Sequence, residues 1–323
     1  MKCNVLVYFC LFANAIAFGQ DPVNDSQALE ITGETRLVFA SQQRGQKLLK
    51  QIGPFIQKMQ DLERQIRLES TEPVSQEQYL SYLASGVEEW QPADREVIRQ
   101  AAGRLRKLFE GLKLPFPPEI HLIRVAKNVE ANAPHCRGAS IVLPDGFFDS
   151  GQVDNVLAHE LFHVLSSHNK DLRDKMYSII GFSRCEEIDL PASLLSRRLT
   201  NPDAPLHEHF VELERDGVVS KYIPVTFTKS ASYGGGNLFA NLEFQLMELE
   251  RSGEALVPRM KDAKPVLVSP REMPSYLQKI GRNTGYIIHP EETLADNFSM
   301  MVLSSPNIVD PWVTSKLRML LSE

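Results

Sequence analysis

Apolar residues recur at helical intervals through most of the first hundred residues. Between residues 36 and 69 the spacing is interrupted near Gly53-Pro54, which predicts two helical pieces. Residues 74–90 and 93–112 show the same periodicity and predict two further helices. The chain before residue 113 is therefore expected to be mostly helical.

The pattern changes at residue 113, where three prolines precede a run of alternating apolar and polar side chains. Glu119 to Val125 is predicted to be a strand, and residues 139–144 a second short strand that ends at a turn. The apolar spacing before His168 predicts a helix that begins at Ser150 or Gln152. Neither glycine nor proline interrupts residues 152–168.

The later part of the chain alternates between extended and helical patterns. Residues 205–270 are mostly of strand character, although 238–250 fit a helix as well as a strand. Residues 290–303 and 310–321 predict two closing helices. Together the elements predict an α+β fold.

The first twenty residues have the composition of a secretory signal peptide. One lysine, Lys2, precedes an apolar run from Val5 to Phe12, and small residues follow, with cleavage expected after Ala17 or Gly19. An uncleaved membrane anchor is the alternative, but the apolar run is shorter than the roughly 20 residues that span a bilayer. We therefore expect a signal peptide over residues 1–19 and an exported mature chain, periplasmic or secreted, without an integral membrane segment.

Charge and cysteine content limit the remaining possibilities. The formal net charge of −6 argues against nucleic acid as a partner. Cys136 and Cys185 are the two cysteines beyond the leader, and they fit either one disulfide or two free thiols.

The helix ending at His168 contains the sequence His159-Glu160-Leu161-Phe162-His163, an HExxH motif. On a helix the two histidines lie about 40° apart and one turn along, so both imidazoles can reach one metal ion. Glu160 is suited to take a proton from a metal-activated water. The alternative is an ordinary buried helix with hydrogen-bonded histidines, so a third ligand is needed to decide.

Two candidates for the third ligand differ in geometry. His168 lies about 140° away from the ligand face of the same helix, and no glycine turns the chain back. Glu292 and Asp296 lie four residues apart on one face of the predicted helix that begins at Pro290. Glu292 could complete the coordination and Asp296 could accept the second N–H of a ligating histidine, although an acidic first helical turn is also stabilising by itself.

These motifs resemble those of the gluzincin metallopeptidases that combine an Asn-Ala segment, HExxH and ExxAD. The group includes the bacterial membrane heat-shock protease, the CAAX prenyl protease and periplasmic chaperone-proteases. The resemblance covers residues 128–168 and 292–298, with the elements in the same order. The membrane helices of several relatives are absent, and the stretch between His163 and Glu292 is longer than the pattern requires.

The resemblance implies one zinc ion held by His159, His163 and Glu292, with Glu160 as general base and Asp296 orienting a histidine. It also implies that Asn132-Ala133 and residues 139–144 line a substrate cleft, where a peptide could bind as an added strand.

The implied fold is mostly helical and zincin-like, with a small sheet over the HExxH helix. The catalytic domain would span 116–323 and carry an inserted extended segment at about 205–268. The helical N-terminal region, 20–115, would be an integral lobe, a partner-binding module or a removable pro-segment, and we favour the integral lobe.

The expected function is that of an exported zinc metallopeptidase acting on peptides or proteins. Tyr286 and His289, just before the Glu292 helix, are candidates to stabilise an oxyanion. A non-catalytic binding or chaperone-like protein on the same scaffold is the alternative, and a zinc hydrolase acting on a non-peptide amide is a third possibility. The sequence favours the enzyme, because a scaffold has no need for Glu160.

Overall fold

The computed structural model describes residues 28–322, so the predicted signal peptide lies outside the described part of the chain. Helices and sheets both contribute extensively, which confirms the α+β class. Between residues 28 and 322, none of the helices has the length and apolar character that a bilayer crossing demands.

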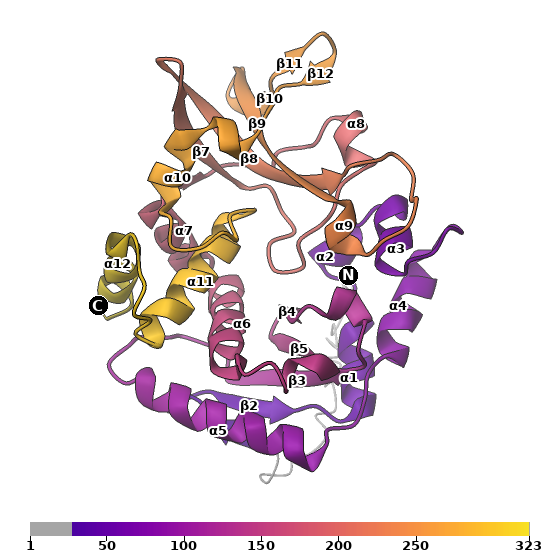
Figure 1. The fold of residues 1–323 in the computed structure, drawn as a ribbon, viewed down its shortest axis with the longest axis vertical. Coiled ribbons are helices and arrows are strands. Elements are labelled where there is room, and N and C mark those ends of the chain that lie inside the picture. The colour runs from indigo at the N-terminus through magenta and orange to yellow at the C-terminus, as the bar shows by residue number, and fades with distance from the viewer. Residues whose placement is uncertain (1–27, 323) are drawn as a thin grey trace, which may run out of the picture.

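A five-stranded sheet forms the lower part of the molecule in Figure 1, in the order β1-β2-β3-β5-β4. The inner strands β2, β3 and β5 run parallel, whereas β1 and β4 are antiparallel edge strands. The two strands predicted at Glu119–Val125 and at residues 139–144 are confirmed. The strands are β1 (Ala28–Glu30), β2 (Arg36–Phe39), β3 (Glu119–Val125), β4 (His135–Cys136) and β5 (Ser140–Pro144).

Strand β2 corrects the prediction that residues 36–39 begin a helix. Leu37, Val38 and Phe39 are all buried, and β2 pairs in parallel with β3. Its partner follows some eighty residues later in the chain. The spacing of apolar residues near positions 36–39 carries no information about so distant a partner. Strand formation depends strongly on the neighbouring strands against which the side chains pack.

Helices cover both faces of this sheet. Leu122 of β3 packs in the cluster that includes α5 and α6, whereas its neighbour Ile123 packs in the cluster that includes α1, α2 and α4. This opposite orientation follows from the alternation of side chains along a strand. The helices are α1 (Gln42–Leu49), α2 (Pro54–Lys58), α3 (Asp61–Arg67), α4 (Gln76–Ser85), α5 (Pro92–Leu108) and α6 (Val153–His168).

A second, antiparallel sheet lies at the opposite end of the molecule, in the order β10-β9-β8-β7-β6, with β13 also pairing with β9. Most of it comes from the segment predicted to be extended. The ambiguous stretch 238–250 divides into one helical turn, α9 (Leu238–Asn241), followed by a strand. The strands are β6 (Phe182–Arg184), β7 (His209–Arg215), β8 (Val218–Thr228), β9 (Leu242–Ser252), β10 (Ala255–Pro258) and β13 (Leu267–Val268), with a small hairpin of β11 (Met260–Lys261) and β12 (Lys264–Pro265).

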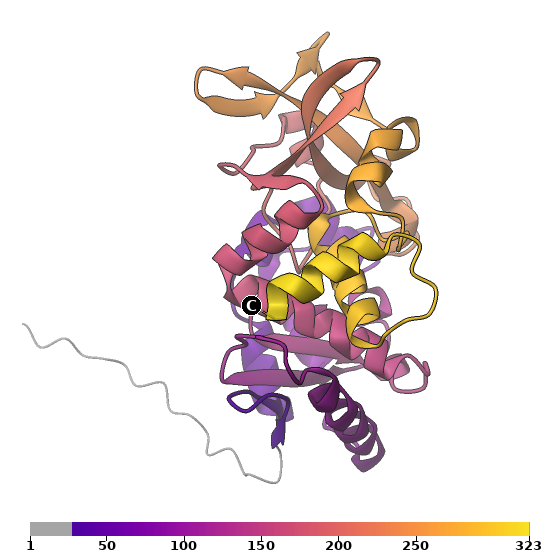
Figure 2. The same cartoon turned by 90° about the vertical axis from the view of Figure 1, so that its left-hand side faces the viewer.

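The helices that carry the candidate site lie between the two sheets (Figures 1 and 2). α11 packs along α6 and buries one side of it, while the five-stranded sheet covers another side. Both closing helices are confirmed. The remaining helices are α7 (Lys170–Ile179), α8 (Ala192–Leu195), α10 (Pro274–Ile280), α11 (Pro290–Val302) and α12 (Pro311–Ser322).

Candidate metal centre

Helix α6 presents His159 and His163 on one face, with their ring centroids 4.7 Å apart. The helix is continuous through the motif and is buried on most sides, with Leu157, Leu161 and Phe162 fully inaccessible. Because the helix is fixed by packing, the direction of both imidazoles is fixed with it. His168 is exposed at the end of the helix, away from this face.

Helix α11 brings Glu292 to the same point. Its first turn begins at Pro290, and His289 caps it, because the His289 Nδ1 accepts the Glu291 N–H at 3.1 Å. A proline in the first turn and an acceptor at the cap both favour a helix start here. His289 is thus engaged in holding the helix end, with its pKa lowered by burial to about 3.

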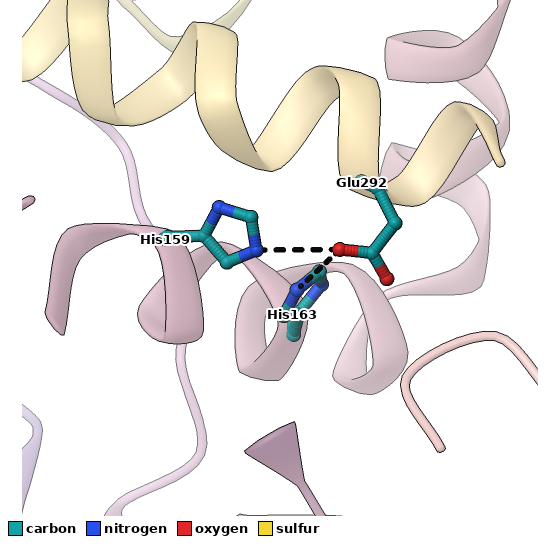
Figure 3. A group of neighbouring side chains, drawn as sticks. All are labelled: His159, His163 and Glu292. Atoms are coloured by element: carbon teal, nitrogen blue, oxygen red, sulfur yellow. Dashed lines mark ion pairs between the residues drawn. The ribbon is translucent and has the colours of Figure 1, made fainter. Parts of the chain in front are cut away.

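The three candidate ligands converge, as Figure 3 shows. One carboxylate oxygen of Glu292, Oε2, lies 3.3 Å from His159 Nε2 and 3.5 Å from His163 Nε2. Around a tetrahedral zinc with ligands at about 2.0–2.2 Å, neighbouring donor atoms are separated by roughly 3.3–3.5 Å. The spacing of the three side chains therefore fits a single tetrahedral ion.

The second nitrogen of each imidazole bonds to its own carboxylate. His159 Nδ1 lies 2.8 Å from Asp296 Oδ1, and His163 Nδ1 lies 2.9 Å from Glu291 Oε1. An ionised carboxylate only accepts, so each Nδ1 carries a proton, and in the neutral form that a metal requires each ring directs its Nε2 lone pair toward Glu292. Lone pairs facing a carboxylate oxygen repel it unless a cation or proton lies between, so the chemistry of the donor set also fits a metal.

Glu291 is a partner of His163 that the sequence motifs did not predict. Its side chain is buried and also accepts hydrogen bonds from Ser166 Oγ at 2.7 Å and from the Tyr177 hydroxyl. The doubled acid Glu291-Glu292 is the one local signal, but adjacent helical positions point about 100° apart. Only the packing of α6 and α7 around α11 shows that both carboxylates are used.

The charges at the site favour a cation. Burial lowers the pKa of His159, but hydrogen bonds to Asp296 and Glu292 outweigh burial and raise it to about 9. For Glu292, burial acts to raise the pKa, yet His163 and His159 hold it well below its usual range. The carboxylates thus stabilise positive charge where the Nε2 atoms meet.

Glu160 lies on the same helix and is buried, and burial raises the pKa of its carboxyl group. Its Oε2 accepts from the Cys136 thiol, with the sulfur 3.3 Å away. Cys136 and Cys185 are both free thiols, so they do not form the disulfide that was the alternative. Cys136 belongs to β4, so the edge of the sheet runs beside the proposed general base.

The loop 199–203 contacts the site through two side chains, and no motif in the sequence predicted it. Asn201 Nδ2 donates to Glu292 Oε1 at 2.6 Å, which leaves Oε2 facing the histidines. Asp203 Oδ1 accepts the Cys136 N–H at 2.7 Å. Asp203, Cys136 and Glu160 thereby form a second group of ligand-type atoms, all within 4.8 Å of one another.

Tyr286 lies beside His159 and reaches the surface. Its ring stacks against His159, with centroids 6.3 Å apart and planes inclined by 15°, and the side chain is partly exposed. The charge of Glu292, together with burial, raises the pKa of Tyr286 well above its usual value. The phenol therefore stays protonated at neutral pH and can donate a hydrogen bond.

Comparison with known proteins gives no independent assignment. No protein-family model matches the chain, and no curated protein or solved structure matches it significantly.

Proposed function

We propose that this chain is an exported zinc-dependent metallopeptidase of gluzincin type. One observation carries the proposal: both Nε2 atoms face a single oxygen of Glu292 at the spacing of a tetrahedral ion, and both Nδ1 atoms are held by carboxylates. Structural zinc sites are closed by four protein ligands, whereas three ligands leave a place for water or substrate.

His159, His163 and Glu292 would hold the ion, which when bound supplies a Lewis acid for a carbonyl oxygen and acidifies a water molecule. Glu160 would accept the proton of that water at its carboxylate and later deliver it to the leaving amine. Asp296 and Glu291 would keep both imidazoles in the ligating tautomer, and Tyr286 would donate to the developing oxyanion.

A peptide would bind alongside β4, because β4 is the edge of the sheet next to Glu160. This places the substrate strand differently from the sequence-based expectation. Ser140–Pro144 forms β5, which pairs with β3 on one side and with β4 on the other. A substrate strand therefore cannot pair with β5 where both neighbours do so. Asn132 belongs to a turn with positive φ angles that leads into β4.

The proposal also assigns the parts of the chain. Residues 116–323 would be a zincin-like catalytic domain with an insertion at about 205–268, and residues 20–115 would be an integral lobe. The pairing of β2 with β3 supports the integral lobe, because β2 lies inside the sheet that packs on α6.

A non-catalytic zinc protein on the same scaffold is the second candidate. Two contacts favour this candidate: Asn201 bonds to Glu292, and Asp203 accepts the Cys136 N–H at the edge of β4. A substrate that binds at the centre would approach these same groups. An enzyme must exchange these two side-chain contacts for contacts with substrate during turnover, whereas a structural site has no such need.

Metal content and the Glu160→Gln variant test the proposal together. The purified mature protein is expected to contain one zinc ion, and the variant should retain it while hydrolysis of unfolded protein falls by roughly 10²–10⁴-fold. Glutamine preserves the shape of Glu160 and removes only its basicity. A wild-type protein without stoichiometric zinc would refute the proposal, and zinc without turnover would support the non-catalytic candidate.

A further inference from the structure

A cavity of about 150 Å³ lies next to the metal centre. Its walls come from distant parts of the chain: the turn before β4, the loop 199–203, the start of β9 with α9, and the single residues Arg67, Thr226, Tyr286 and Ile288. Most of its surface is apolar, and the aliphatic and aromatic side chains that line it include Ala133, Pro134, Leu199, Pro202, Leu238, Phe239, Leu242 and Ile288.

Two charged residues at the cavity, Arg67 and Glu130, are bonded to each other, and a third, Asp203, accepts the Cys136 N–H. Arg67 donates to Glu63 at 2.7 Å and to the Thr200 carbonyl at 2.7 Å, and it also bonds to Glu130. Glu130 accepts in addition from the Tyr79 hydroxyl. Because Arg67 and Glu130 are buried and mutually bonded, they offer little to a charged ligand, and the remaining surface suits an apolar one.

The size of the cavity suits a ring or a branched aliphatic group. An engineered apolar cavity of about 150 Å³ in another protein stays dry and binds benzene. At the rim, Phe239 is 52% exposed although it is aromatic, and Tyr286 is 39% exposed. Two part-exposed aromatic rings beside an apolar cavity are typical of a ligand-binding surface.

The cavity is continuous with the metal centre through three residues. Tyr286 lines the cavity and stacks on His159, Asn201 lines it and bonds to Glu292, and Asp203 lines it and bonds to the β4 edge. A peptide bound along β4 with a carbonyl at the centre would therefore pass the mouth of the cavity.

We propose that this cavity is a specificity pocket that receives an aromatic or branched aliphatic side chain of the peptide, next to the bond that is cleaved. The proposal rests on the proposed peptidase function for the cleavage, but the binding of an apolar side chain by the cavity can be tested without turnover.

The first experiment measures selectivity. Peptides of one backbone sequence that carry Phe, Leu, Ala, Glu or Lys on either side of the cleaved bond are compared by kcat/KM. On one side, Phe and Leu are expected to exceed Ala by roughly 10- to 100-fold, from the apolar area buried. An equal or greater rate for Lys or Glu would overturn the proposal, because the cavity would then accept a charged side chain as well as an apolar one.

Two variants and a control locate the selectivity. Ala133→Phe fills the cavity and should reduce the Phe-to-Ala ratio of kcat/KM at least tenfold. Phe239→Ala, at the rim, should raise KM for the Phe peptide with little change in kcat. Val219→Ala removes an equally exposed apolar side chain that does not line the cavity, and it should leave the ratio unchanged. A ratio unchanged by Ala133→Phe would contradict the assignment.

The second experiment is independent of catalysis. N-acetyl-phenylalaninamide is titrated into the Glu160→Gln protein, and methyl NMR signals are followed, with N-acetyl-glutaminamide as the polar control. Leu238, Leu242 and Ile288 should shift with the first probe, whereas Val218 and Val219 should not. Binding without hydrolysis of any peptide would support the pocket and refute the peptidase, and shifts that are absent or equal for both probes would refute the pocket.

Discussion

Each histidine of the HExxH motif is bonded at Nδ1 by its own buried or half-buried carboxylate, Asp296 for His159 and Glu291 for His163. Such partners fix the ring orientation and raise the basicity of the nitrogen that binds the metal. Glu291 is the better enclosed of the two, because Ser166 and Tyr177 also donate to it.

At the residue scale, this arrangement predicts the effect of two isosteric variants. Asp296→Asn and Glu291→Gln should each lower zinc affinity on the order of 10- to 100-fold, because the amide no longer holds the ligating tautomer. Competition with a chromogenic chelator measures the affinity. The matched control is Glu272→Gln in the short turn at Pro270–Glu272, which should bind zinc as the wild type does. Wild-type affinity in both test variants would show that the carboxylates are not needed for the site.

At the scale of elements, the edge strand β4 contains a buried histidine with a low pKa. Burial lowers the pKa of His135 to about 4, because the charge of Glu130 offsets only part of the desolvation. The imidazole is therefore neutral in the fold at neutral pH. In the unfolded chain it takes up a proton near its ordinary value of 6.5.

This difference predicts how stability depends on pH. Below about pH 6.5 the unfolded state binds a proton at His135 that the native state does not bind. The contribution of His135 to the free energy of unfolding is therefore fully present above pH 6.5 and is lost as the pH falls to 4. The difference between a pKa of 6.5 and one of about 4, at roughly 1.4 kcal/mol per pH unit, corresponds to about 3.5 kcal/mol. Urea unfolding in the presence of a chelator should show a loss between pH 7 and pH 4.5 that is smaller in His135→Gln. Parallel pH profiles would contradict the prediction.

At the scale of the whole molecule, one buried network connects the N-terminal helices to the site. Glu63 and Arg67 of α3 bond to the backbone and side chain of Thr200, and Arg67 also bonds to Glu130 in the turn before β4. Thr200 adjoins Asn201, which bonds to Glu292. The first helices thus hold the loop that positions a candidate metal ligand.

Removing the cation of this network should be costly. Arg67→Met leaves Glu63 and Glu130 buried without their partner and is expected to destabilise the protein by about 3–5 kcal/mol. The triple variant Glu63→Gln, Arg67→Met, Glu130→Gln removes all three charges and should recover part of the loss. Chemical denaturation measures both. A loss of stability below about 1 kcal/mol for Arg67→Met would show that Arg67, Glu63 and Glu130 do not form a buried ion-pair network.

Local secondary structure explains which residues of the candidate site could be predicted from the sequence. His159, Glu160, His163, Glu292 and Asp296 lie on two helices whose periodicity is visible in the sequence, and side chains four residues apart on a helix share a face. Asn201 and Asp203 lie in an irregular loop, where no period relates one residue to the next. Their roles became apparent only when the loop was seen against α11 and β4.

The amino-acid sequence by itself determined the local features: the helix over residues 153–168, the strand over 119–125, the start of α11 at Pro290 and the types of side chain available for a metal. These depend on neighbours within a few residues, whose spacing is fixed by covalent geometry. Only the tertiary structure decided that residues 36–39 are a strand, that Glu291 serves His163, that the two cysteines remain apart and that an apolar cavity adjoins the centre. Each of these depends on contacts between segments far apart in the chain, which no local pattern records.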